Sequence, residues 1–224
     1  MSWNRIFAGG LALVLSVLPA RAAEPVDVAL VLVVDVSLSV NDARYQLQKE
    51  GIAAAFENPD LAKAIGGGIN GAVAVAVMEF SDPDRQFAVI DWTRIASAED
   101  ARRLAARIRR TGRSSDGLTG IADALIAAQE MLESSPFAAA RRVVDVSGDG
   151  MNNIGTEMTA ARDRLVAAGI TINGLPILSE EPWLATYYTE YVIGGPDAFV
   201  ITAEGLDSFA EAMKRKLVQE VKVS

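Results

Sequence analysis

The stretch VDVALVLVVDVSLSV, residues 26–40, decides the fold class of this 224-residue chain. Val28 to Val34 is an unbroken apolar run rich in β-branched residues, which is typical of a strand buried on both faces of a sheet. The pattern then changes, because Asp35, Ser37 and Ser39 place a carboxylate and two hydroxyls at every second position. We therefore expect a central strand whose carboxyl end carries polar side chains.

The first 22 residues have the pattern of an export signal. A short cationic start at Trp3 to Arg5 precedes the apolar run Ile6 to Pro19 and the small-residue sequence Ala20-Arg21-Ala22, so we expect cleavage after Ala22. The apolar run is shorter than the roughly 20 residues that cross a membrane. We therefore expect a periplasmic or secreted protein with no membrane anchor after signal cleavage, and a single domain at residues 23–224.

The composition excludes several classes of protein. With no cysteine and no histidine, the chain has no disulfides, no thiol nucleophile, no imidazole-based catalytic triad and none of the usual zinc sites. Arg5 and Arg21 are the only charged residues of the predicted signal, so its removal changes the formal net charge from −8 to −10. This negative charge argues against nucleic acid as a partner.

Strand-like and helix-like segments alternate along the chain, which predicts an α/β domain with a three-layer, doubly wound, Rossmann-like architecture. The turn sequence Ser81 to Asp84 separates two strands and predicts an antiparallel edge strand on a mostly parallel central sheet. We expect strands at residues 28–35, 72–80, 86–92, 143–147, 170–178 and 198–202, and helices at residues 42–56, 97–110, 120–132, 156–168 and 206–221.

Two carboxylates are expected at one edge of this sheet. Asp35 follows the first strand, and Asp149 follows the strand RRVVDVS at residues 141–147. The carboxyl ends of the strands are where open α/β sheets bind ligands. Because adjacent carboxylates repel each other and resist burial, a cation between them is the simplest account of both.

The sequence DVSLS, Asp35 to Ser39, resembles the D-x-S-x-S motif that begins the metal-ion-dependent adhesion site of von Willebrand factor A domains. Thr119, in DGLTGIADAL, resembles the threonine of that site. Asp149, in VSGDG, resembles its second aspartate, although the preceding Ser147-Gly148 departs from the family's usual residues. The resemblance extends over residues 26–221.

This resemblance implies a von Willebrand A-like domain in which Asp35, Ser37, Ser39, Thr119 and Asp149 hold one Mg²⁺ or Mn²⁺ ion. An all-oxygen set of hydroxyls, carboxylates and waters suits these hard ions and lacks the soft ligands that zinc favours. Two carboxylates balance the dication, so it stays able to accept an Asp or Glu of a protein partner at an open position. We therefore expect a metal-dependent interaction module rather than an enzyme.

Other readings of the same residues stay open. GDGMNN, residues 148–153, is close to a motif of haloacid dehalogenase-like phosphohydrolases, but this chain has Ser37 and Asn153 where that family needs aspartates. A von Willebrand A-like domain that no longer binds metal is a second alternative. Asp35 with Ser37 also fits an Asx-type turn, and Thr119 fits the N-cap of its helix.

Four further segments stand out in the sequence beside the predicted ion site. GGGING, residues 66–71, follows a helix and precedes a strand, so we interpret it as a loop and not as a dinucleotide site. ARRLAARIRR, residues 101–110, indicates a solvated helix face. WLATYYTEYV, residues 183–192, indicates either a short packed helix or a partner-binding surface. YVIGGPDAFV, residues 191–200, resembles a bacterial family described as a domain of unknown function.

Two smaller questions stay open at this stage. Asp116, Asn152 and Asn153 fit either groups that support the ion site or simple loop and turn formers. In the von Willebrand A family, metal coordination can be coupled to displacement of the closing helix, which here is residues 206–221. A similar shift in this chain is a hypothesis motivated by the position of that helix alone.

Overall fold

The computed structural model describes residues 23–179 and 181–222, so the predicted export signal lies outside the described residues. Five strands form one sheet in the order β3-β2-β1-β4-β5. β1, β2, β4 and β5 pair in parallel, and β3 is antiparallel to β2 at one edge. This confirms the predicted fold class. The strands are β1 (Glu24–Asp35), β2 (Val73–Phe80), β3 (Gln86–Ile95), β4 (Phe137–Gly148) and β5 (Thr171–Pro176).

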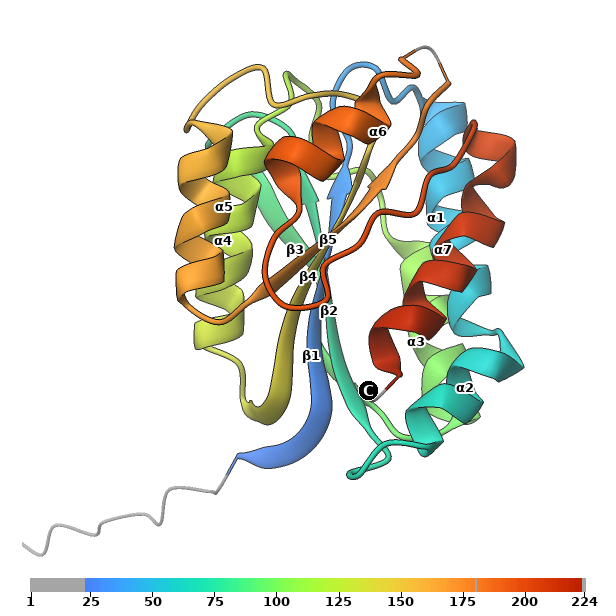
Figure 1. The fold of residues 1–224 in the computed structure, drawn as a ribbon. Coiled ribbons are helices and arrows are strands. Elements are labelled where there is room, and N and C mark those ends of the chain that lie inside the picture. Colours follow the sequence, from blue (N-terminus) through green and yellow to red (C-terminus); the bar gives the residue numbers. More distant parts are fainter. Residues whose placement is uncertain (1–22, 180, 223–224) are drawn as a thin grey trace, which may run out of the picture.

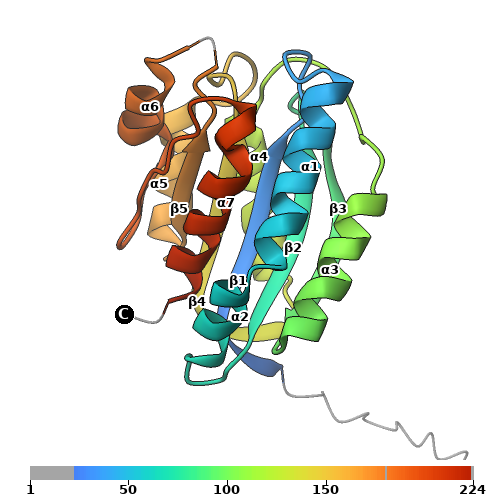
Figure 2. The same cartoon turned by 90° about the vertical axis from the view of Figure 1, so that its right-hand side faces the viewer.

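Helices cover both faces of the sheet (Figures 1 and 2). On one face lie α1 (Asp42–Phe56), α2 (Pro59–Gly66), α3 (Ala98–Arg110) and α7 (Leu206–Val221). On the other face lie α4 (Ile121–Glu133), α5 (Met158–Ala167), the single turn α6 (Leu184–Tyr187) and the π-helix η1 (Tyr188–Val192). The three layers are therefore helix, sheet and helix.

The central position of β1 explains its unbroken apolar run. Val28, Leu30 and Leu32 pack into the core under α1, α3 and α7, and Ala29, Val31 and Val33 pack into the core under α4 and α5. Each of these side chains is at most 1% exposed. Since burial of one such aliphatic side chain contributes roughly 1.5–3 kcal/mol, β1 is a major source of stability for both layers.

The predicted last strand, residues 198–202, is wrong as a strand. This segment runs beside β5 but makes only isolated bridges to it, at Gly174 with Val200 and at Ile177 with Ala203, among the described residues. The backbone amide of Phe199 donates to the side chain of Asn173 at 3.0 Å. A side chain thus takes the place of a backbone acceptor, which interrupts a regular ladder.

The short helix α2 was not among the helices predicted from the sequence. Pro59 occupies the start of this helix, where its missing N–H costs nothing, and the side chain of Asn58 accepts a hydrogen bond from the amide of Asp60 at 3.1 Å. Proline and asparagine after α1 are also ordinary turn residues. The local pattern therefore did not separate a turn from a second short helix.

The closing helix α7 carries a buried charge cluster into the core. The Lys216 ammonium lies 2.7 Å from Asp145 Oδ1 of β4 and 2.6 Å from Glu220 Oε1, and all three side chains are at most 1% exposed. Asn173 of β5 donates to Glu220 Oε1 at 3.1 Å. Burial, together with the nearby Asp145 carboxylate, raises the pKa of Glu220 to about 8. Lys216 therefore lies between two buried acidic side chains, and the surroundings of Glu220 favour its neutral form.

Replacement of Lys216 by Met tests how strongly this cluster holds α7. The change leaves the Asp145 carboxylate buried without a cation, so we expect a loss of about 3–5 kcal/mol in the free energy of unfolding, measured with urea. Lys214→Met, on the exposed side of the same helix, removes only a surface ion pair with Glu211 and should cost less than about 1 kcal/mol. Equal losses in the two variants would contradict this role for the cluster.

Candidate metal site at the carboxyl edge of the sheet

Three loops meet beyond the carboxyl ends of β1 and β4, at the top of the molecule in Figure 1. They are the β1–α1 loop at residues 36–41, the α3–α4 loop at residues 111–120 and the β4–α5 loop at residues 149–157. In the parallel register Val34 pairs with Ser147, so Asp35 and Asp149 both follow within two residues of this pair. The sheet itself brings the two carboxylates together.

Four of the five predicted ligands form one chain of hydrogen bonds. Asp35 Oδ1 accepts from the Ser37 amide at 2.8 Å. The hydroxyls of Ser37 and Ser39 are 3.1 Å apart, and the Ser39 hydroxyl donates to Asp149 Oδ1 at 2.6 Å. Asp35 and Ser37 are buried, whereas Ser39 is exposed at the rim.

Thr119 reaches the same place from the α3–α4 loop. A side-chain carbon built on Gly150 would lie 3.5 Å from Thr119 Oγ1, so this hydroxyl faces the backbone directly after Asp149. The Thr119 amide donates to Asn153 Oδ1 at 2.9 Å, and the Thr119 carbonyl accepts from the Asn153 amide at 3.0 Å. The structure therefore places Thr119 beside Asp149. Its amide and its carbonyl are both hydrogen-bonded to Asn153 of the β4–α5 loop.

Two simpler structural roles were considered for these residues, an Asx-type turn at Asp35 and an N-cap at Thr119, and the structure shows the first and not the second. Asp35 does form the Asx-type turn with the Ser37 amide, which uses Oδ1. Thr119 is not the N-cap of α4, because Gly120 takes that position without a side-chain hydrogen bond. The cap comes instead from the next loop, where Asn152 Oδ1 accepts from the Ala122 amide at 2.9 Å. The hydroxyl of Thr119 is thus not used for capping.

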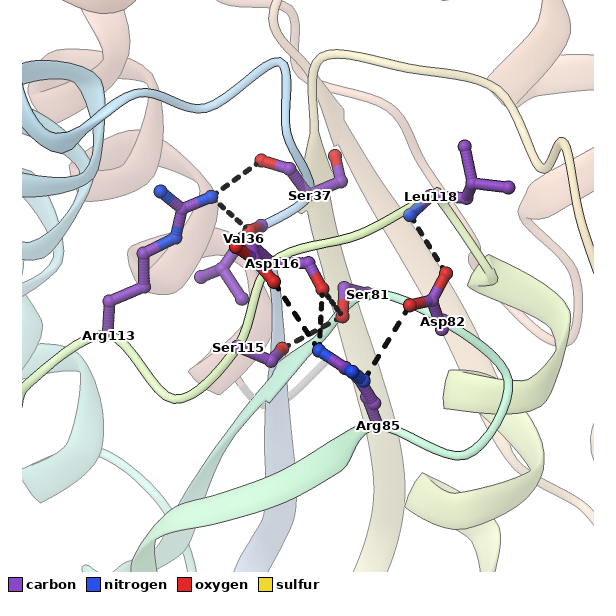
Figure 3. A network of polar contacts seen from close by, with 9 residues as sticks. All are labelled: Val36, Ser37, Ser81, Asp82, Arg85, Arg113, Ser115, Asp116 and Leu118. Atoms are coloured by element: carbon purple, nitrogen blue, oxygen red, sulfur yellow. Dashed lines mark hydrogen bonds and ion pairs between the residues drawn. The ribbon is translucent and has the colours of Figure 1, made fainter.

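A network of hydrogen bonds joins the α3–α4 loop to the β1–α1 loop (Figure 3), and most of it was not predicted from the sequence. The Arg113 guanidinium donates to the carbonyls of Val36 and Ser37 at 2.6 and 2.9 Å. The Leu38 amide donates to the Gly117 carbonyl at 2.9 Å. Arg113 therefore fixes the backbone from which Ser37 and Ser39 project.

The turn between β2 and β3 supports the same loop from below (Figure 3). Asp82 Oδ1 accepts from the Leu118 amide at 2.9 Å, and Arg85 donates to the Asp116 carbonyl at 3.2 Å. The Asp116 side chain is 65% exposed and pairs with Arg85. Asp116 thus shapes the loop. The polar character of TGRSSDG was the only signal for these contacts in the sequence, and it did not reveal their partners.

The surroundings of Asp35 disfavour the charged form of its carboxyl group. Burial raises the pKa of Asp35 to about 7, the hydrogen bonds of Ser37 lower it, and the Asp149 carboxylate raises it again. Asp35 Oδ2 is buried and accepts no hydrogen bond from the described part of the chain. Arg44 Nη1 lies 3.3 Å from Asp149 Oδ2, so Asp149 already has a cation near one oxygen.

The donor set fits a hard dication. Two carboxylates and three hydroxyls converge, and the unpaired Asp35 Oδ2 is a buried acceptor of the kind that a cation satisfies. Within residues 23–179 and 181–222, no group of three or more His, Cys, Asp or Glu side chains forms an alternative metal site. The residues present therefore agree with an oxygen-ligated divalent ion.

The family of the chain follows from a comparison of its sequence with family models. The model described as "Protein of unknown function (DUF1194)" matches residues 25–224. The chain belongs to this family. No curated protein matches it. In the part of the chain that the structure describes, no helix is long and apolar enough to cross a membrane.

The fold is that of a von Willebrand factor A domain, as comparison with solved structures shows. Proximal thread matrix protein 1 from the mussel byssus, "with zinc occupied MIDAS motif", aligns at TM-score 0.60 and 21% identity over 89% of this chain and 47% of its own. The chain thus spans about half the length of that protein.

Two bacterial structures support the same assignment of the fold. The vWF domain of the type V pili tip protein Mfa5 from Porphyromonas gingivalis aligns at TM-score 0.59 and 13% identity, over 89% of this chain and 96% of that domain. A von Willebrand factor type A protein from Catenulispora acidiphila aligns at TM-score 0.58 and 16% identity, over 88% and 43% of the two chains. At these identities the likeness establishes the fold and no activity.

Replacement of Arg113 by Met tests the loop network. The variant loses two charge-assisted hydrogen bonds to buried carbonyls, so we expect urea unfolding to show a loss of about 1.5–3 kcal/mol. Arg110→Met, an exposed position at the end of α3, is the matched control and should change the free energy of unfolding by less than about 0.5 kcal/mol. Identical stabilities for both variants would show that Arg113 does not hold the β1–α1 loop.

Proposed function

We propose that this protein is an exported, metal-dependent protein-binding module of the von Willebrand A type. Asp35, Ser37, Ser39, Thr119 and Asp149 would hold one Mg²⁺ or Mn²⁺ ion. The observation that carries the proposal is the convergence of these five oxygen-bearing side chains from three loops, with Asp35 Oδ2 buried and unpaired. The proposed domain is residues 23–224, preceded by an export signal at residues 1–22.

Each residue has a distinct task in this proposal. Asp35 and Asp149 supply two negative charges, and Ser37, Ser39 and Thr119 supply neutral oxygens. The Ser37 amide orients the Asp35 carboxylate, and Arg113 holds the backbone of the β1–α1 loop. A bound dication would supply a Lewis-acidic position at which a carboxylate of a partner can be held.

Apolar side chains at the rim favour a protein partner. Leu38 is 68% exposed, Leu118 47% and Met151 43%. Each comes from a different loop and lies within two residues of a proposed ligand. Exposed apolar side chains gathered around a polar centre are typical of protein interaction sites.

The negative net charge of the chain affects how an acidic partner would bind. The chain without its signal carries a net charge of −10, so its overall field repels an acidic protein at long range. Local contacts with the ion and with the apolar rim would have to supply the affinity for a partner's Asp or Glu. Solved neighbours named as a pilus tip protein and a byssus matrix protein support an interaction role over an enzymatic one.

A metal titration tests the proposal. Saturating Mg²⁺ or Mn²⁺ should raise the melting temperature by roughly 5–10 °C at 100 times the dissociation constant, because a ligand of the native state stabilises a domain of this size by about 2.7 kcal/mol. Asp149→Ala should abolish the shift, since it removes one of the two charges that attract the ion. Differential scanning fluorimetry measures both proteins.

Asp163→Ala is the matched control, because this carboxylate is 68% exposed on α5, outside the three loops. It should keep the full metal response. A wild-type protein without any shift would contradict the proposal and favour a domain that no longer binds metal. Turnover of an aryl phosphate by the wild type would instead favour the haloacid dehalogenase-like alternative.

A further inference from the structure

Tyr188 is a buried tyrosine that is not among the five proposed metal ligands. It is the first residue of η1, and its side chain is 0% exposed. Its hydroxyl has no hydrogen-bond partner among the described residues. Its neighbour Tyr187 differs, since that hydroxyl accepts from the Asn152 amide at 3.2 Å. Tyr191, three residues on, is 44% exposed.

Two glycines in adjacent strands make room for this tyrosine. A side-chain carbon on Gly174 of β5 would lie 2.7 Å from Tyr188 Cδ1, which is too close for a real contact. A side-chain carbon on Gly148 of β4 would lie 3.1 Å from the Tyr188 hydroxyl oxygen. The ring therefore lies over β5 with its hydroxyl near the carboxyl end of β4, and a larger residue in place of Gly174 would displace it.

An oxygen of the candidate metal site, Asp35 Oδ2, also lies close to Gly148. The carbon built there would lie 2.8 Å from Asp35 Oδ2, as well as 3.1 Å from the Tyr188 hydroxyl. The hydroxyl and the carboxylate oxygen thus border one small space without a side chain. This also gives a physical reason for glycine at position 148, where the sequence departs from the von Willebrand A pattern.

The two unpaired atoms are chemically complementary. A phenolic hydroxyl donates one hydrogen bond, and a carboxylate oxygen accepts one. A buried polar atom without a partner is destabilising, so a water bridge between these two atoms satisfies both. Oδ1 is already held by the Ser37 amide, so the bridge would fix both ends of the Asp35 carboxylate. A carboxylate oxygen has two lone pairs, so Oδ2 can accept from the bridge and still face an ion.

We propose that Tyr188 is a positioning residue of the metal site, which holds Asp35 Oδ2 through one bridging water molecule that accepts from the Tyr188 hydroxyl and donates to the carboxylate. This inference rests on the proposed function, because it concerns how the Asp35 carboxylate is presented to the ion. Groups that hold metal ligands in this way typically change metal affinity by 10- to 100-fold when they are removed. Tyr188 acts through Asp35 and does not itself contact the ion.

The test compares Tyr188→Phe with Tyr191→Phe, using Mg²⁺ and Mn²⁺ alone as the probes. Phenylalanine keeps the ring and removes only the hydroxyl. We expect calorimetry to show metal affinity reduced at least about 10-fold in Tyr188→Phe and unchanged in Tyr191→Phe. A metal-induced change in tyrosine ultraviolet absorption should be present in the wild type and in Tyr191→Phe and absent in Tyr188→Phe.

These readouts separate the inference from the proposed function. If the wild type and Tyr188→Phe bind metal equally well, or if Tyr188→Phe keeps the absorption change, the positioning role is overturned and the metal site stands. If the wild type binds no metal, both are overturned. A purely structural tyrosine would lower the metal-free melting temperature and leave the affinity unchanged, which also overturns the inference.

Discussion

The structure depends on the parallel pairing of β1 with β4 at the centre of the sheet. This pairing carries apolar side chains into both layers of the core and brings Asp35 and Asp149, one and two residues past its last pair, to the same edge. Two neighbouring carboxylates are unfavourable, and the chain moderates the repulsion with hydroxyls, one backbone amide and Arg44. The fold therefore concentrates negative charge at one edge of the sheet, and a divalent cation is suited to neutralise it.

A second pair of acidic side chains is buried under α7. Asp145 and Glu220 both lie within 2.7 Å of the Lys216 ammonium, and Asn173 donates to Glu220. At the candidate metal site the nearby cation, Arg44, pairs with Asp149, and no ion pair with Asp35 is formed in the described part of the chain. The Lys216 cluster is thus an internal, structural group of charges. The candidate metal site lies at the edge of the sheet, where a cation can enter from solvent.

The sequence predicted those features that depend on local patterns. The apolar run of β1, the turn before β3 and the apolar spacing of α7 each indicated their element, and the fold class is confirmed. It also predicted which five side chains to look for, and the structure brings them together, although their binding of an ion stays a proposal. Contacts between distant loops could not be predicted, because nothing near Arg113 or Asn152 in the sequence identifies the Val36 carbonyl or the Ala122 amide as a partner.

The packing of Tyr188 against Gly148 and Gly174 could not be predicted for the same reason, because these residues lie in segments far apart in the sequence.

The most direct test of the central claim is a crystal structure of the protein soaked in Mn²⁺, with anomalous diffraction used to locate the ion. The account predicts one peak bounded by Asp35, Ser37, Ser39, Thr119 and Asp149. A fully soaked crystal with no peak there, or with its peak elsewhere on the molecule, would contradict it.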